Sequence, residues 1–455
     1  MNTEAPKTPN QDPIRPTEED STLPVHKPRV VVKFQDSVQF PYEDGVEKYF
    51  DPENQAAWKQ IVTAFPGITL KRAFTSLPPE KIRALVARSA RRDKAYRSKN
   101  FLAYFAIEYP PNANPHELVR ALLSWKAVQT AYLEGTPAPP PAVNPNDTRF
   151  SRQDYLDPAP LGIDASFAWP RPGGDGEGTR FVDLEQGWGL NHPDLPTAAI
   201  TQLPGHNRFY QSHGASVLGI LVAVDNTVFH VGIAPKASAS IISEWRSSTA
   251  YNTADAIMVA ISELDFGDVL LLETQYLVDH RLWPIEWQLA AREWIETGVS
   301  EGIVVIEAAG NGRNDLDPPA WENSGAVMVG AATATHPHVK TLSSNFGSRI
   351  DCYAWGESVD TLSAEPPRFT TNFSGTSSAS AIVAGAALIV QGIAKKKFGR
   401  FYWPHELRAI LSNPDHGTKS QNHPTDRIGV MPNLKEIVTR IDNESIAPPA
   451  PSPDS

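Results

Sequence analysis

Residues 372–394, NFSGTSSASAIVAGAALIVQGIA, join a Gly-Thr-Ser turn to a long run of small and apolar residues. A run of this length without a charged residue predicts a buried helix, and Ser377 stands near its first turn. Small residues at a helix start commonly allow close packing of backbones, so Ser377 can be purely structural. Alternatively, Ser377 is a catalytic nucleophile, and the rest of the sequence decides between these interpretations.

From residue 179 onward, short apolar strands alternate with helices. The strands are predicted at 179–185, 237–245, 268–274, 303–310 and 326–333, and the helices at 213–224, 253–264, 284–299 and from Ser377 onward. The last two strands are almost wholly apolar, as expected for strands covered on both faces. The alternation is typical of an α/β domain in which helices cover a mostly parallel sheet.

A smaller α/β unit precedes this domain, and a Pro-rich linker follows the small unit. Its strands are expected at 29–34, 68–74, 102–109 and 127–134, and its helices at 56–64, 79–92 and 114–125. The predicted organisation is a disordered arm (1–28), the small unit (29–135), the linker (136–147), the larger domain (148–442) and a disordered tail (443–455).

The composition excludes several classes of function. The chain has 455 residues and a net charge of −11, so it carries no overall attraction to nucleic acid. Its single cysteine, Cys352, cannot form an intrachain disulfide. The polar N-terminus lacks a secretory signal pattern, and no stretch predicts a membrane span. We therefore expect no membrane partner, and a protein that is cytoplasmic by default or exported by a non-classical route.

Basic residues gather in and after the second predicted helix of the small unit. They are Arg88, Arg91, Arg92, Lys94, Arg97 and Lys99. Such a cluster either binds an acidic partner or forms a solvated helix face, and the sequence alone favours the solvated face.

Three further polar stretches stand at the ends of predicted elements, where function collects in α/β sheets. They are VDLEQGWGLNHPDL (182–195), QSHGASVLG (211–219) and VIEAAGNGRN (305–314). With the Gly-Thr-Ser turn they give the chain order acid, His, Asn, Ser. This is one of three known orders for catalysis by a serine, a histidine and an acid.

At these residues the chain resembles the subtilisin-like serine proteases, peptidase family S8. His213-Gly214 is similar to the histidine motif of that family, Ala309-Gly310-Asn311 to its oxyanion motif, and Gly375-Thr376-Ser377 to its nucleophile motif. The resemblance covers roughly residues 147–440. It implies a doubly wound, subtilisin-like α/β sandwich and a serine endopeptidase acting on peptides or proteins.

The resemblance also implies a role for each residue. Ser377 is expected to attack the peptide carbonyl, His213 to take and return its proton, and Asn311 to bind the oxyanion. Gly310 is expected at the substrate groove. The small unit resembles a propeptide, so the chain is expected to be made as a precursor inhibited by its own N-terminal domain. No cofactor or metal is expected, and structural calcium is left open.

Two acids compete for the partnership with His213. Counting back from His192-Pro193-Asp194-Leu195 without a gap reaches Glu185, whereas Asp183 has the usual residue type but needs a two-residue insertion. Residues two apart on a strand face the same side, so both can lie near His213. We favour Glu185 as the direct partner, with Asp183 behind it and coupled to it. His192 itself belongs to a structural turn in the resemblance.

The predicted groove strand departs from the family pattern. Where the family has Ser-Leu-Gly, this chain has Glu273-Thr274-Gln275. Glu273 is therefore expected to bind substrate and to favour basic side chains. The departures also leave two rival interpretations, a catalytically inert protein with this fold that binds or scaffolds a partner, and an acyl hydrolase that uses the same residues without cutting peptides.

Overall fold

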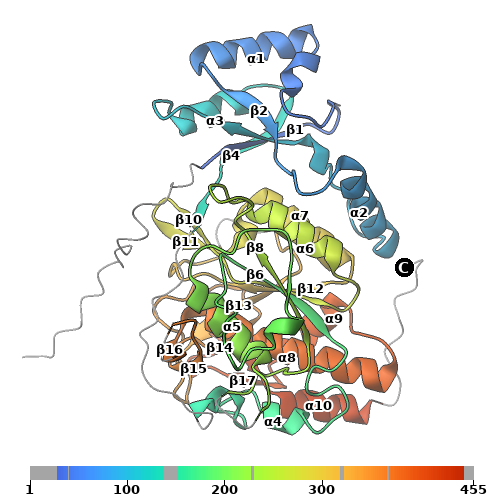
Figure 1. The fold of residues 1–455 in the computed structure, drawn as a ribbon, viewed down its shortest axis with the longest axis vertical. Helices are drawn as coiled ribbons and strands as arrows, with labels where there is room; N and C mark the ends of the chain where they lie inside the picture. Colours follow the sequence, from blue (N-terminus) through green and yellow to red (C-terminus); the bar gives the residue numbers. More distant parts are fainter. Residues whose placement is uncertain are drawn as a thin grey trace, which may run out of the picture.

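The computed structural model describes residues 28–38, 40–137, 152–226, 230–317, 322–365 and 368–444. They form a small N-terminal unit on top of a larger α/β domain (Figure 1). The predicted arm and tail fall outside this range, apart from residue 28 and residues 443–444. Most of the predicted linker also falls outside it.

The small unit is an antiparallel sheet with the strand order β2-β3-β1-β4. Its strands are β1 (Val30–Phe34), β2 (Thr69–Arg72), β3 (Tyr104–Glu108) and β4 (Val128–Leu133), and its helices are α1 (Pro52–Ala64), α2 (Pro79–Arg92) and α3 (Pro115–Leu123). Side chains alternate along β1. Val30 and Val32 pack under α1 and α3, while Val31 packs toward the larger domain. The sheet therefore has two buried faces.

The larger domain is built on a sheet with the strand order β17-β18-β14-β13-β12-β9-β6-β8-β7. These strands are β6 (Arg180–Glu185), β7 (Thr201–Gln202), β8 (Ser238–Ser243), β9 (Val269–Leu272), β12 (Val304–Ala308), β13 (Val327–Ala332), β14 (Cys352–Trp355), β17 (Gly417–Lys419) and β18 (Val430–Pro432). Every pairing is parallel except that of β17 with β18. The mostly parallel α/β sheet predicted from the sequence is confirmed.

Helices cover both faces of this sheet. One face carries α4 (Ala165–Ala168), α5 (Gln211–Val222), α8 (Gly375–Phe398), α9 (Pro404–Leu411) and α10 (Leu434–Asn443), and the other carries α6 (Thr253–Glu263) and α7 (Leu289–Ser300). Helix α8 is apolar and long enough to cross a membrane, but its apolar window is entirely buried within the protein. It is therefore a core helix, and its first turn places Ser377 beside the residues that follow β12.

Short elements that the sequence did not predict complete the domain. They include the hairpin of β10 (Tyr276–Val278) and β11 (Arg281–Trp283) and the hairpin of β15 (Val359–Leu362) and β16 (Phe369–Phe373). Thr136 and Pro137, expected in the linker, instead form β5, which pairs antiparallel with β10. The chain therefore leaves the small unit directly along β10.

The small unit packs against helices α6 and α7 of the larger domain (Figure 1). Phe101 stacks on Trp294 with ring centroids 3.7 Å apart. The Lys33 ammonium and the Tyr104 hydroxyl both bond the buried Glu293 carboxylate, at 2.9 and 2.6 Å. Stacked aromatic rings and a paired buried charge give this interface the character of a protein core.

The basic cluster of the small unit contributes to the same interface. Arg88 and Arg92 form ion pairs with the fully buried Glu301, and Lys99 pairs with Glu296. The solvated-face interpretation is therefore wrong for these three residues. The acidic partner of the cluster lies in the same chain, on helix α7 and at its C-terminal end.

Candidate active site

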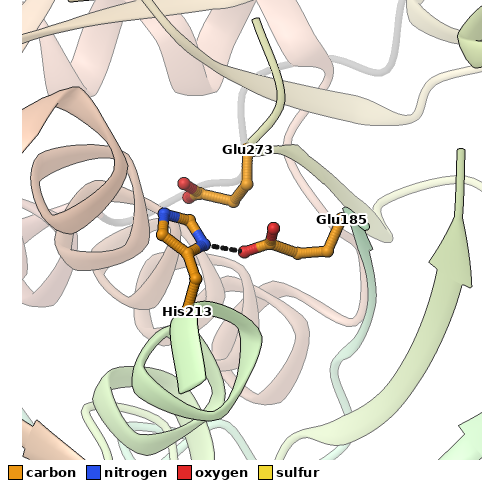
Figure 2. Close-up of side chains that lie close together, drawn as sticks. All are labelled: Glu185, His213 and Glu273. Atoms are coloured by element: carbon orange, nitrogen blue, oxygen red, sulfur yellow. Dashed lines mark hydrogen bonds and ion pairs between the residues drawn. The ribbon is translucent and has the colours of Figure 1, made fainter. Parts of the chain in front are cut away.

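The acid side of the site lies at the end of β6, where Asp183 and Glu185 are both buried. Glu185 Oε1 lies 2.6 Å from Nδ1 of His213 (Figure 2). Asp183 instead accepts a 2.7 Å hydrogen bond from the indole N–H of Trp188. The acid that contacts the imidazole in this structure is thus the one in the ungapped register, and Asp183 lies behind it.

His213 is held in the first turn of α5. Its backbone N–H donates to the Tyr210 carbonyl at 2.8 Å, and the Phe373 ring packs edge-on against its imidazole at 5.1 Å between centroids. The side chain is only 3% exposed. Its Nε2 atom is buried and has no hydrogen-bond partner among the described residues, so no hydrogen bond joins His213 to Ser377 here.

The turn before Ser377 is bonded to the turn after β12. The backbone N–H of Thr376 donates to Asn311 Oδ1 at 3.0 Å, and Gly310 N–H donates to Thr376 Oγ1 at 3.1 Å. Gly375 has φ +84°, a left-handed conformation that favours glycine and turns the chain into α8. Asn311 and Ser377, 66 positions apart, are thereby brought to one place.

A glutamine occupies the donor face of Asn311. Gln275 Oε1 accepts the backbone N–H of Asn311 at 2.9 Å and approaches its side-chain amide at 3.5 Å. The second of these contacts is long for a hydrogen bond. A more highly charged carbonyl oxygen can therefore replace Gln275 Oε1 as the acceptor of the Asn311 amide. From the sequence, Gln275 was recognised only as a departure from the family pattern, and this contact with Asn311 was not predicted.

Glu273 lies beside the imidazole and not on an open wall of the groove. It is 5% exposed, and its Oε1 accepts a 2.7 Å hydrogen bond from the Ser380 hydroxyl. Figure 2 shows its carboxyl directed at the ring nitrogen of His213 that Glu185 does not contact. The preference for basic substrate side chains stays a prediction.

Burial dominates the electrostatics of these groups. Burial raises the pKa of Asp183, Glu185 and Glu273 well above their usual values, and the charges of Glu185 and Asp183 raise the pKa of Glu273 further. The 2.7 Å hydrogen bond from Ser380 and the nearby Ser377 hydroxyl act in the opposite direction and lower the pKa of Glu273. Burial also lowers the pKa of His213 to about 4, so its imidazole is neutral over most of the pH range.

The same side chains bring possible metal ligands together. Glu185, His213 and Glu273 each offer a ligand atom, and these atoms lie within 4.8 Å of one another. However, Nδ1 of His213 is committed to Glu185, which leaves one nitrogen and one carboxylate for a cation. Closed zinc sites use four protein ligands and catalytic zinc sites three, so with Nδ1 bonded to Glu185 this group offers fewer free ligands than a zinc site uses.

The other predicted residues and some unpredicted ones also have definite places. His192 bonds the Arg368 carbonyl at 2.9 Å and accepts the Asp194 N–H at 3.1 Å, as a residue of a turn does. Trp188 and Ser380 were not predicted, although each donates a hydrogen bond to an acid of the site. The only signal was spacing, since Trp188 follows Glu185 by three residues and Ser380 follows Ser377 by one helical turn.

Comparison with known proteins places this geometry in a family. The model of the subtilase family, peptidase S8, matches residues 199–430, slightly more than half of the chain. The chain belongs to the subtilase family and is a serine endopeptidase. The match begins after both acids of β6, the part of the site that departs most from the family pattern.

Individual relatives agree with this assignment. Subtilisin DY of Bacillus licheniformis is 29% identical over 215 residues, covering 46% of this chain and 74% of its own. The intracellular serine protease of Paenibacillus polymyxa is 27% identical over 263 residues, covering 52% and 73%. The solved structure of the prenylagaramide maturation protease PagA has the same fold, with a TM-score of 0.50, 21% identity and coverage of 62% and 99%.

Proposed function

We propose that this endopeptidase cuts peptide bonds with Ser377 as nucleophile, His213 as base, Glu185 as the acid that orients His213, and Asn311 as the oxyanion donor. The observation that carries the proposal is the 2.6 Å contact between Glu185 and Nδ1 of His213. It leaves the lone pair of Nε2 available to a serine, and a neutral imidazole is the form that can accept a proton.

The steps follow from these positions. Ser377 Oγ bonds to the peptide carbonyl carbon while its proton passes to Nε2 of His213, and the carbonyl oxygen becomes an oxyanion. Glu185 stabilises the imidazolium that forms. The Asn311 amide and the Ser377 backbone N–H, in the first turn of α8, donate to the oxyanion. His213 then returns the proton to the leaving amine, and water completes the hydrolysis.

The proposed role of Asn311 is supported by its hydrogen bond with Thr376, which attaches it to the nucleophile turn. Removal of such a donor in subtilisin itself lowers kcat by about 10² to 10³, a value that comes from that relative and not from this chain. Here Gln275 has to release the amide before it can bind the oxyanion.

We also propose that the N-terminal unit acts as an inhibitor of the same chain. The pairing of Thr136 and Pro137 with β10 supports this, since β10 follows directly on Glu273–Gln275 beside the site. A Cβ on Gly135 would meet Gln288 Nε2 at 2.8 Å and Tyr276 Cβ at 3.0 Å, so the chain enters this strand with little space to spare. A substrate peptide adding to β10 would compete with β5.

The direct test is Ser377→Ala. We expect hydrolysis of a chromogenic peptide to fall to background, while circular dichroism and the melting temperature stay those of the wild type. Unchanged turnover by the pure variant would contradict the proposal. A wild type that stays inert even after its N-terminal unit has been cut off would instead favour a binding or scaffold protein with this fold.

A further inference from the structure

Among the residues that the structure describes, two buried polar atoms of the site have no hydrogen-bond partner, and both lie on the same side of the imidazole. They are Oε2 of Glu273 and Nε2 of His213. Glu273 Oε1 is occupied by Ser380, and Nδ1 of His213 is occupied by Glu185. Figure 2 shows the Glu273 carboxyl next to the free ring nitrogen. A buried polar group without a partner is costly, so two of them side by side call for an explanation.

The charges around Glu273 limit its protonation state. From β6 it faces Asp183 and Glu185, from α5 it faces the neutral His213, and from α8 it meets only the hydroxyls of Ser377 and Ser380. A further buried acid, Glu244 after β8, has its pKa raised to about 8 by burial and by the charge of Glu185. None of these neighbours is a cation, and several buried carboxylates without a cation cannot all be ionised.

One proton satisfies both atoms. A carboxylic acid that carries its proton on Oε2 is a donor, and Nε2 of a neutral imidazole whose proton is on Nδ1 is an acceptor. A carboxylate oxygen of Glu273 lies within 4.8 Å of a ring nitrogen of His213. A rotation of the Glu273 carboxyl can therefore bring Oε2 into hydrogen-bond distance of Nε2. Ser380 fixes which carboxyl oxygen turns toward the ring.

We propose that Glu273 is held as the neutral acid and donates this hydrogen bond to Nε2 of His213, in competition with Ser377 for the catalytic base. The inference rests on the proposed roles of Ser377 and His213. Turnover then requires Glu273 to lose its proton to solvent. The freed Nε2 accepts the Ser377 hydroxyl, and the reaction proceeds as above. Glu273 thus acts directly on the base and sets the pH at which the enzyme works.

The sign of the pH effect follows. The neutral acid predominates below the pKa of Glu273, so activity rises as pH increases through that raised pKa. Hydrogen bonding from Ser380 lowers this pKa, so its loss raises the pKa and moves the acidic limb of the profile to higher pH. The Asp183 charge raises the pKa, so Asp183→Asn moves the limb to lower pH.

A rival role for Glu273 is a relay that takes the proton of Ser377 on one oxygen and passes its own to His213. That role needs a hydrogen bond from Ser377 to Glu273. No such bond of ordinary geometry is present among the described residues, although the Ser377 hydroxyl lies near enough to lower the pKa of Glu273. The structure favours competition, and the experiment below separates the two roles.

Two substitutions of Glu273 test the proposal with opposite expected results. In Glu273→Gln the amide N–H₂ replaces the acid proton and cannot be titrated, so Nε2 stays occupied. We expect kcat/KM to fall by about 10² or more at every pH, the scale of a lost general base. In Glu273→Ser the side chain is too short to reach the ring. We expect activity to persist at acidic pH, because the acidic limb of the pH profile moves to lower pH by more than about one pH unit.

The measurement is the pH profile of kcat/KM on one peptide substrate. Two matched variants serve as controls, since Ser380→Ala should move the acidic limb to higher pH and Asp183→Asn should move it to lower pH. An acidic limb that stays in place in Glu273→Ser overturns the proposal, and so does full activity of Glu273→Gln. Loss of activity in Glu273→Ser with an intact fold indicates the relay instead. If Glu273→Ser does not fold, the two limb shifts decide alone. Turnover that survives Ser377→Ala marks a failure of the proposed function and not of this inference.

Discussion

At the scale of single residues, the two acids of β6 differ in what they touch although they face the same side. Glu185 reaches the imidazole because its longer side chain projects from the last residue of the strand, while Asp183 is two residues further into the sheet and bonds Trp188. Counting residues from His192 was enough to favour Glu185. The bond to Trp188 could not be predicted, because it depends on how the chain turns after Gln186.

Substitution of these acids is expected to separate them. Glu185→Gln keeps the shape of the side chain but removes the charge that orients and stabilises His213, and the comparable loss in the serine-protease template is about 10⁴ in kcat. Asp183→Asn keeps an acceptor for Trp188 and should cost far less. Steady-state kinetics of both variants on one peptide checks this. If Asp183→Asn is the inactive variant, Asp183 is the catalytic acid.

Glu273 shows where sequence reasoning reaches its limit. Its position on the predicted groove strand was clear, but its direction was not, because the turn that follows β9 decides whether the carboxyl faces the substrate or the imidazole. Ser377, His213 and Asn311 were easier to predict, since each stands beside glycine and small residues that the close approach of two turns requires.

At the scale of elements, most long strands and helices were predicted to within about five residues, whereas α9, α10, β14 and the short hairpins were missed. The sequence signal of β6, β12 and α8 is strong because these elements are buried on several sides and are therefore mostly apolar. The β10–β11 hairpin turns through Asp279 and His280, which both have positive φ. A turn of this kind usually contains Asn-Gly or Asp-Gly, so its sequence signal was absent.

The two ends of α8 offer a matched pair of substitutions. Gly375 and Gly399 both have left-handed φ, +84° and +72°, but only Gly375 adjoins the nucleophile turn. Alanine at either position should cost about 1–3 kcal/mol of unfolding free energy through backbone strain. Gly375→Ala should also lower kcat, whereas Gly399→Ala should not. Thermal melts and peptide kinetics check both, and equal kcat values in the two variants would contradict the role given to Gly375.

At the scale of the whole molecule, the small unit is positioned by one helical layer of the larger domain. Glu293 and Trp294 on α7 bond and stack with the small unit, and Asp255 on α6 accepts the backbone N–H groups of Thr75 and Ser76 at 3.0 and 3.2 Å. The sequence predicted two units but not this interface. The charged residues of the interface cannot be distinguished in the sequence from solvent-exposed residues until their partners are known.

This arrangement predicts that the precursor cuts itself between about Glu134 and Arg152, in the stretch that contains β5 and the Pro-rich linker. The freed N-terminal unit should stay bound through α6 and α7, so both fragments should elute together. Mass spectrometry of purified wild type should show two fragments, and Ser377→Ala should show one intact chain. A wild type that is intact yet fully active would show that the N-terminal unit is not a cleaved inhibitor.

The central claim is that Ser377 is a nucleophile activated by the Glu185–His213 pair, and labelling with a fluorophosphonate tests it most directly. Such a probe reacts with an activated serine and marks it covalently. We expect one adduct per chain, located by peptide mapping at Ser377, absent from Ser377→Ala and strongly reduced in His213→Ala. A folded wild type that hydrolyses peptides while Ser377 remains unmodified, or that carries the label on another residue, would contradict the account.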